Sequence, residues 1–423
     1  MAQELPGVTL FPGGVEVVAE PGDQRGNRWP AEWVRYDDPL TGRRVTRFTS
    51  SRGTDQHPYF TGPAVTADGQ HLVFISDRTG NPNIFALDMA SGQIVQLTDN
   101  RYGVLRQYVF PWGNRTGLGK SSVVLHPGTG HVYFMQGRQV RRVHAGTGEQ
   151  KAIAELPPGW VTAFTHVSAD DRFLCVPLVP EEAFAESAEA GLATHGRSML
   201  RTCARVRELG LMSELWVVAT DGSSQSVWAR QNSWITHVQF RPTESRYLLF
   251  NNEAIGEAPG GQRIWMCDGH TGNVWKIRPE PPDRRHWNCH EMWTADGSRI
   301  LYHGTGLHPE SGQWLNFFGF ADLEGTHYQE CFLKPDEARG YGHFAEHPTA
   351  GHVFCDGYYG DSKLITEVWP GEDGYARWRP VCRHDSKWIY QDDHPHPLYA
   401  PNPGILIYSS SAEGVGNVYG VEL

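Results

Sequence analysis

One short string near the C-terminal end has the residue types of a metal site. Residues 391–397 read Gln-Asp-Asp-His-Pro-His-Pro, which places His394 and His396 two positions apart. On a regular strand, two residues at this spacing share a face, and the prolines suppress ladder pairing and stiffen the segment. Gln391 can add an amide oxygen to the two imidazoles. Nitrogen and oxygen ligands of this kind suit a divalent transition metal such as Mn, Fe or Zn, and they lack the acidic cage that calcium prefers.

A repeated pattern places further histidines at one equivalent position. Seven times the chain has a short turn rich in Asp, Gly, Pro or Thr and then an apolar run, at residues 66–74, 126–134, 168–176, 241–250, 294–302, 347–355 and 400–408. The last four copies begin 53 residues apart. The position five residues before the Pro or Ala of each turn holds, in chain order, Gly62, Ser122, Phe164, His237, His290, His343 and His396.

These elements define the fold. A second strand–turn–strand pattern follows most copies, at residues 84–98, 140–154, 215–229, 264–277 and 320–333. Because two hairpins make four strands, seven such units predict an all-β, seven-bladed β-propeller, in which only short sheet edges are exposed. A set of unrelated all-β domains is the alternative, but it would make the regular spacing accidental.

The ends of the chain and one insertion complete the predicted organisation. The last unit stops before its outer strand, and residues 36–50 have the pattern of that missing strand. We therefore expect an N-terminal strand to close the last blade, a propeller over residues 36–423, and an arm over residues 1–35. Residues 180–212 are rich in Ala, Glu and Arg and predict a helical insertion. It could be a surface decoration or a lid over one mouth of the ring.

The innermost strand of each blade lines the central channel, so His237, His290, His343 and His396 are predicted to face one another near one mouth. A single histidine on a strand is usually structural, whereas four in register favour a shared site. His343, His394 and His396 can then converge on one metal ion, with Gln391 beside them. Arginines near the same units favour a carboxylate or phosphate ligand, although each alone could be an ion-paired surface residue: Arg241, Arg263, Arg284 and Arg285.

Composition excludes several classes of protein. Aromatic residues make up 12% of the 423 residues, enough to build a large core, so the chain is not intrinsically disordered. The net charge of −11 argues against nucleic-acid binding, and no apolar stretch approaches the ~20 residues that span a bilayer. Seven scattered cysteines without a C-x-x-C pair predict reduced thiols. The N-terminal residues lack the features of a signal peptide, so we expect a cytoplasmic protein.

From about Tyr36 to its end the chain resembles oligogalacturonate lyases, seven-bladed propellers that act on short pectin fragments. The resemblance lies in residues 263–269 (RIWMCDG), 289–298 (CHEMWTADGS), 341–351 and 389–410, whereas residues 250–263 and the helical insertion do not match the family. It implies one Mn²⁺ ion as the cofactor and a small acidic oligosaccharide as the substrate. By motif, the resemblance further implies His290 as the base, Arg263 as the catalytic arginine, and four metal ligands: His343, Gln391, His394 and His396. Second-rank candidates for contacts with the substrate are His237, Arg241 and His57.

The chemistry implied by this resemblance is β-elimination at a uronic acid. A cation against the carboxylate stabilises the enolate-like intermediate, a neutral histidine takes the C5 proton, and the C4–O bond breaks without consuming water. The products would be unsaturated or 5-keto-4-deoxyuronates. Three alternatives stay open: a lyase for another uronate-containing oligosaccharide, another metal-dependent enzyme such as a hydrolase, and a non-catalytic propeller that binds a partner. The sequence does not set the oligomeric state.

Overall fold

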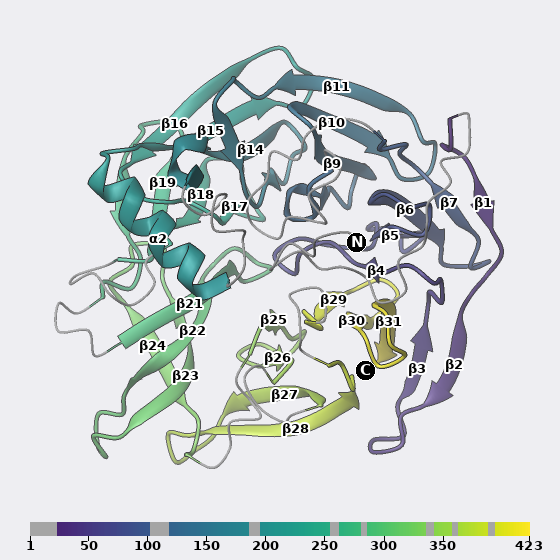
Figure 1. Cartoon of the computed structure of the whole chain (residues 1–423). Coiled ribbons are helices and arrows are strands. Elements are labelled where there is room, and N and C mark those ends of the chain that lie inside the picture. Colours follow the sequence, from purple (N-terminus) through teal and green to yellow (C-terminus); the bar gives the residue numbers. More distant parts are fainter. Residues whose placement is uncertain are drawn as a thin grey trace, which may run out of the picture.

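The protein is a seven-bladed β-propeller. The computed structural model describes residues 23–101, 118–185, 195–253, 262–280, 286–335, 342–357, 363–387 and 394–423. In this part of the chain, seven antiparallel sheets follow one another in chain order around a central axis (Figure 1). The predicted fold class is therefore confirmed.

Each blade has four principal strands. The first three blades contain β4 (Asp55–Gln56), β5 (His71–Ser76), β6 (Asn83–Asp88) and β7 (Ile94–Gln96); β8 (Val124–Leu125), β9 (His131–Gln136), β10 (Gln139–His144) and β11 (Gln150–Glu155); and β12 (Trp160–Thr162), β13 (His166–Val167), β14 (Phe173–Pro180), β15 (Ser213–Ala219) and β16 (Gln225–Gln231). The next three contain β17 (Val238–Phe240), β18 (Tyr247–Asn251), β19 (Ile264–Asp268) and β20 (Val274–Lys276); β21 (His286–Trp293), β22 (Ile300–Leu307), β23 (Trp314–Ala321) and β24 (Tyr328–Phe332); and β25 (Phe344–Glu346), β26 (Val353–Cys355), β27 (Leu364–Pro370) and β28 (Ala376–Arg383).

The seven repeated sequence patterns lead into the second strand of each blade. Strands β5, β9, β14, β18, β22, β26 and, in the last blade, β30 (Ile405–Ser410) each follow one turn. These strands read as nearly continuous apolar runs because both of their faces are covered by neighbouring blades. In the turn before β5, Gly69 adopts a φ of +72°, which is the conformation that glycine tolerates best.

The N-terminal region closes the ring, as predicted. Strand β3 (Arg44–Arg47) pairs with the last strand, β31 (Asn417–Glu422), and the seventh blade runs from β2 (Val34–Asp37) through β3, β31 and β30 to β29 (Leu398–Ala400). However, β1 (Arg28–Trp29) pairs with β7 of the first blade. Strands β1 and β2 both begin before residue 36 and belong to blades of the propeller. The expected boundary between the arm and the propeller at residue 36 therefore lies too far along the chain.

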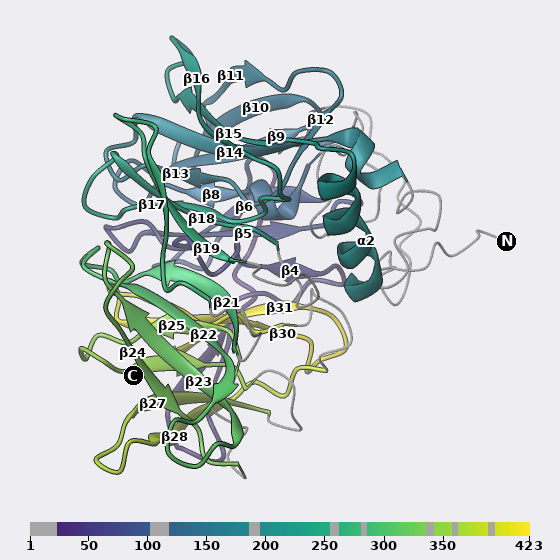
Figure 2. The same ribbon diagram turned by 90° about the vertical axis from the view of Figure 1, so that its left-hand side faces the viewer.

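The insertion lies between β14 and β15 of the third blade. It comprises a short 3₁₀ helix, η2 (Glu181–Phe184), and α2 (His195–Glu208), with residues 186–194 outside the described part of the chain; a second 3₁₀ turn, η1 (Lys120–Ser122), precedes β8. Cys203 and Val206 of α2 are buried in one apolar cluster with Trp234, Tyr59 and Phe60. Figure 2 shows α2 on one face of the ring.

Two other expectations can be compared with the structure. None of the seven cysteines forms a disulfide, and only Cys289 among them is partly exposed, which agrees with the prediction of reduced thiols. Among the described residues, no helix combines the length and apolar character needed to cross a membrane.

Candidate metal centre and base

The histidines at the repeated position converge at one mouth of the propeller. His237 and His343 directly precede the innermost strands β17 and β25, His396 lies two residues before β29, and His290 lies within β21. The ring centroids of His290 and His343 are 4.4 Å apart, and those of His343 and His396 are 4.1 Å apart. His237 stacks on Phe164, the residue at the equivalent position of the third blade, at 4.4 Å. The histidines that share one position of the sequence repeat therefore lie close together in space.

Two aromatic residues that the sequence analysis did not identify lie between these histidines. Phe60 follows β4 and is almost fully buried. Its ring centroid lies 5.2 to 5.8 Å from those of three histidines, namely His290, His343 and His396. Tyr59 packs on Phe164, and its hydroxyl lies 3.3 Å from Nε2 of His237. The side chains of Tyr59 and Phe60 therefore pack against the histidine rings as an apolar surface. Their sequence signal was an aromatic pair shortly before Gly62, the equivalent position of the first blade.

Three imidazoles form a group that could hold a metal ion. Ring nitrogens of His343, His394 and His396 lie within 4.8 Å of one another. The buried carboxylate of Asp356 accepts a hydrogen bond from Nδ1 of His343 at 2.9 Å and from the backbone N–H groups of His343 and His396. Metal-binding histidines commonly donate their second ring N–H to a carboxylate in this way, which leaves the other nitrogen as the ligand. The residues therefore fit a divalent ion.

The fourth predicted ligand, Gln391, lies outside the described residues. Asp356 was missed because nothing in its own string distinguishes it from a turn residue. His57, expected to contact the substrate, is buried, and its Nε2 lies 3.2 Å from the carbonyl oxygen of Pro395. Since Pro395 separates the two histidines of the string, this geometry favours a positioning role for His57.

The carboxylate of Asp356 should control metal affinity. In the Asp356→Asn variant, an amide N–H₂ group replaces one oxygen that accepts hydrogen bonds from His343 and His396, while the side-chain shape is kept. We expect the affinity for Mn²⁺ to fall about 10–100-fold, as is typical when such a partner is lost. Calorimetric titration of chelator-treated protein measures this change. Asp322→Asn is the matched control, since Asp322 accepts an equivalent bond from the exposed His327. Unchanged affinity in Asp356→Asn would contradict the assignment.

His290 is held in an unusual backbone conformation. The pairing of β21 with β22 shifts register between Cys289 and Met292, and His290 within this bulge has a φ of +51°. A positive φ at a residue other than glycine is a strained conformation that occurs often at functional sites, and bulges re-aim side chains. Burial, together with the neighbouring His343, lowers the pKa of His290 well below its usual value, so the ring is neutral near pH 7.

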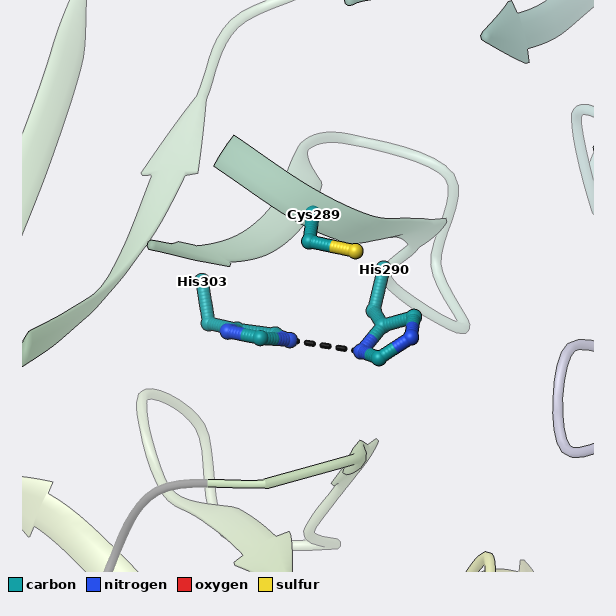
Figure 3. A group of neighbouring side chains, drawn as sticks. All are labelled: Cys289, His290 and His303. Carbon is teal, nitrogen blue, oxygen red and sulfur yellow. Dashed lines mark hydrogen bonds between the residues drawn. The ribbon is translucent and has the colours of Figure 1, made fainter. Parts of the chain in front are cut away.

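The buried His303 contacts His290 through a ring nitrogen. Nδ1 of His290 and Nε2 of His303 are 2.6 Å apart, and the thiol of Cys289 lies beside them (Figure 3). Burial raises the pKa of Cys289 to about 12, so its thiol is protonated at neutral pH. His303 was missed because the sequence analysis considered positions along the innermost strands and not their partners on the next strand, where His303 pairs with Cys289.

Arg263 is close to this cluster but is already ion-paired. It is 3% exposed, its Nε donates to Glu291 at 2.9 Å, and its Nη1 donates to Glu253 at 3.2 Å. Its positive charge is one cause of the low pKa of His237, after burial, which lowers that pKa to about 3. The two carboxylates neutralise the guanidinium, so the geometry favours a positioning role over direct capture of a substrate carboxylate.

The structure does not bring Arg241 to the histidines. His237 precedes β17 and Arg241 follows it, so the two residues lie at opposite ends of one strand, about 13 Å apart along it. Nε of Arg241 donates to the carbonyl oxygen of Gly297, and Nη1 pairs with Glu244. It helps to line a cavity of about 420 Å³ at that end, together with Trp293 and His166. Arg241 therefore lies apart from the histidines, and its predicted contact with the substrate stays a prediction.

The fold and this mouth together define a seven-bladed β-propeller with a three-imidazole group that could hold a metal ion. The family model of oligogalacturonate lyases matches residues 24–313, which is more than half of the chain. The chain therefore belongs to the oligogalacturonate lyase family.

Individual relatives agree with this assignment. The chain is 22% identical over 414 residues to the oligogalacturonide lyase of Pectobacterium atrosepticum and to the oligogalacturonate lyase of Dickeya dadantii, covering 93% of this chain and 97% of each relative. A solved oligogalacturonate lyase in complex with manganese has a TM-score of 0.77 at 20% identity, with 94% of this chain and 98% of that chain covered. The Vibrio parahaemolyticus oligogalacturonate lyase gives 0.76 at 19% identity, with the same coverage.

Proposed function

We propose that this protein cleaves short oligogalacturonides, digalacturonate or its unsaturated form, by metal-assisted β-elimination. The observation that carries the proposal is the adjacency of two kinds of histidine at one mouth. A three-imidazole group suited to a metal lies beside His290, whose ring centroid is 4.4 Å from that of His343. Elimination next to a carboxylate needs a positive charge and a base side by side.

The cofactor is Mn²⁺, held by His343, His394 and His396 with Gln391 as the fourth protein ligand. Support comes from the donor set, from the Asp356 carboxylate behind it, and from the solved relative described as a complex with manganese. When bound, the ion supplies positive charge that stabilises the deprotonated uronate. The three histidines would hold the ion in position, and the carboxylate of Asp356 orients His343.

His290 acts as the base. Its neutral ring accepts the C5 proton, the electron pair of the C5–H bond forms the C4–C5 double bond, and the C4–O bond breaks. The departing oxygen keeps the bond pair and takes a proton from water. The products are an unsaturated uronate, which converts to 5-keto-4-deoxyuronate, and the shortened sugar. Tyr59 and Phe60 exclude water from the back of the histidine cluster, and Arg263 holds Glu291, the residue next to His290.

The substrate is a short acidic chain, and the protein works in the cytoplasm on imported fragments. Seven free thiols are compatible with a reducing compartment. The insertion packs against the aromatic residues behind the histidines, since α2 shares its apolar cluster with Tyr59 and Phe60. The bulk of this insertion beside the histidines disfavours binding of a long polymer.

The test compares several substrates with one protein. We expect purified protein supplied with Mn²⁺ to convert digalacturonate to unsaturated or keto-uronate product, and chelator to stop the reaction until Mn²⁺ is returned. A disaccharide containing glucuronate should react much more slowly. Equal or faster cleavage of that disaccharide would refute the substrate assignment, and binding of digalacturonate without any cleavage would identify a propeller that only binds.

Chain length gives a separate expectation. Because α2 packs with Tyr59 and Phe60 beside the histidines, we expect the insertion to restrict access for a long chain. Digalacturonate should then be cleaved at least about tenfold more efficiently than polymeric pectate, measured as kcat/KM per cleavable end. Equal efficiency on both substrates would show that the insertion does not restrict the mouth.

A further inference from the structure

His303 occupies a distinctive place behind the proposed base. It lies on β22, opposite Cys289 in the strand pairing, and is 0% exposed. Its Nε2 is 2.6 Å from Nδ1 of His290, and Figure 3 shows the other ring nitrogen of His290 pointing away from this contact. The ring of His303 is packed against Phe344 at 5.3 Å and Trp287 at 6.1 Å.

Only one proton can lie between two ring nitrogens at this distance. If His303 donated this proton, Nδ1 of His290 would be the acceptor and the one ring proton of neutral His290 would lie on Nε2. Nε2 would then have no lone pair with which to accept a proton. If His290 donates from Nδ1, its Nε2 is bare and can accept a proton. The direction of this one hydrogen bond therefore decides whether His290 can serve as a base through Nε2.

We propose that His303 is a positioning residue that accepts the hydrogen bond from Nδ1–H of His290, fixing the tautomer in which Nε2 is the base. This inference rests on the proposed function. The bulge at His290 and the packing of His303 on Phe344 hold both rings in one arrangement, so the contact between Nδ1 of His290 and Nε2 of His303 is fixed in place. A base is effective only when its orientation is fixed by groups that are themselves locked.

The same bond persists through the reaction. When Nε2 of His290 takes the C5 proton, the ring becomes an imidazolium with protons on both nitrogens, and Nδ1–H still donates to His303. His303 thus stabilises the charged base without contacting the substrate. A carboxylate fills the equivalent place in serine hydrolases, where the wrong tautomer costs about 10⁴-fold in kcat.

The experiment compares two substitutions with a matched control. His303→Phe keeps a ring and removes the acceptor, whereas His303→Gln can place an amide oxygen near the position of Nε2. The control is His308→Phe, because His308 is also a buried histidine of the fifth blade, stacked on Tyr375. Each protein is compared with the wild type by thermal unfolding, metal content, kcat and KM on digalacturonate, and ¹⁵N NMR of its labelled histidines after paramagnetic ions are removed.

We expect the NMR shifts of His290 to report Nδ1–H in the wild type and a changed tautomer in His303→Phe. The kcat of His303→Phe should fall at least about 10-fold, and at most by the ~10²–10⁴-fold that the base itself contributes, with KM and metal content unchanged. His303→Gln should recover most of kcat, and His308→Phe should match the wild type.

Three results would overturn the proposal. One is a wild-type His290 that is protonated on Nε2. Another is a folded His303→Phe protein with nearly full kcat. The third is loss of a metal ion in His303→Phe, which would show that Cys289, His290 and His303 form a second metal site. If the wild-type protein does not cleave digalacturonate, the proposed function fails, whereas the NMR comparison still decides the role of His303.

Discussion

The His290→Ala variant is expected to fold, to keep one metal ion per chain and to be nearly inactive. Its turnover on digalacturonate should fall about 10²–10⁴-fold, because the group proposed to take the C5 proton beside the metal ligands is gone. The metal should persist because the proposed ligand set does not include His290. Turnover at saturating substrate, elemental analysis and thermal unfolding together measure these outcomes.

Each possible role of His290 gives a different pattern. A ligand role would lower the metal content of His290→Ala, and a structural role would lower its stability while leaving turnover per folded molecule intact. His131→Ala serves as the control, since His131 is a partly exposed strand histidine of the second blade that bonds to Asp171. Retention of most of the turnover would refute the base role.

The double variant His394→Ala/His396→Ala is expected to lose its metal and its activity together. Two of the three imidazoles that lie within 4.8 Å of one another are removed, so the proposed ligands that remain, His343 and Gln391, are too few to hold the ion. Elemental analysis of protein purified without chelator should find about one ion per chain in the wild type and almost none in the variant. Activity should fall to the background rate, even with added Mn²⁺ at micromolar concentration.

A matched double variant separates this effect from general damage. His347→Ala/His352→Ala removes two neighbouring histidines of the sixth blade, which lie beside Glu367 and away from the mouth. It should keep the metal and the activity of the wild type. Full metal content in His394→Ala/His396→Ala would refute the assignment of the ligands.

Much of the fold could be predicted from the sequence because propeller blades are built from local hairpins. Each repeated turn leads into a buried strand, and the constant spacing of the last four copies reflects blades of equal size. Ring closure by β3 was also predictable, since the last unit lacked an outer strand. The start of the propeller before residue 36 was not predictable, because β1 is only two residues long and its pairing with β7 is a long-range contact.

The site was predictable only where register along one strand determines position. Counting back from each turn identified His237, His290, His343 and His396, because the equivalent position of every blade lies at the same mouth. Arg241 was chosen only because it is a basic residue near the same repeat units, and it lies beyond the other end of β17. Contacts between neighbouring strands were harder to predict from the sequence. Asp356 and His303 come close to the histidines through pairing and a bulge that no local pattern marks.

Mass analysis of the products of digalacturonate is the most direct test of metal-assisted elimination at this mouth. Wild-type protein loaded with Mn²⁺ should yield galacturonate and a second product that is lighter than galacturonate by one water molecule, because elimination adds no water. His290→Ala and the double ligand variant should yield neither. Two equivalents of galacturonate would show hydrolysis and would contradict the assignment of His290 as the base of an elimination.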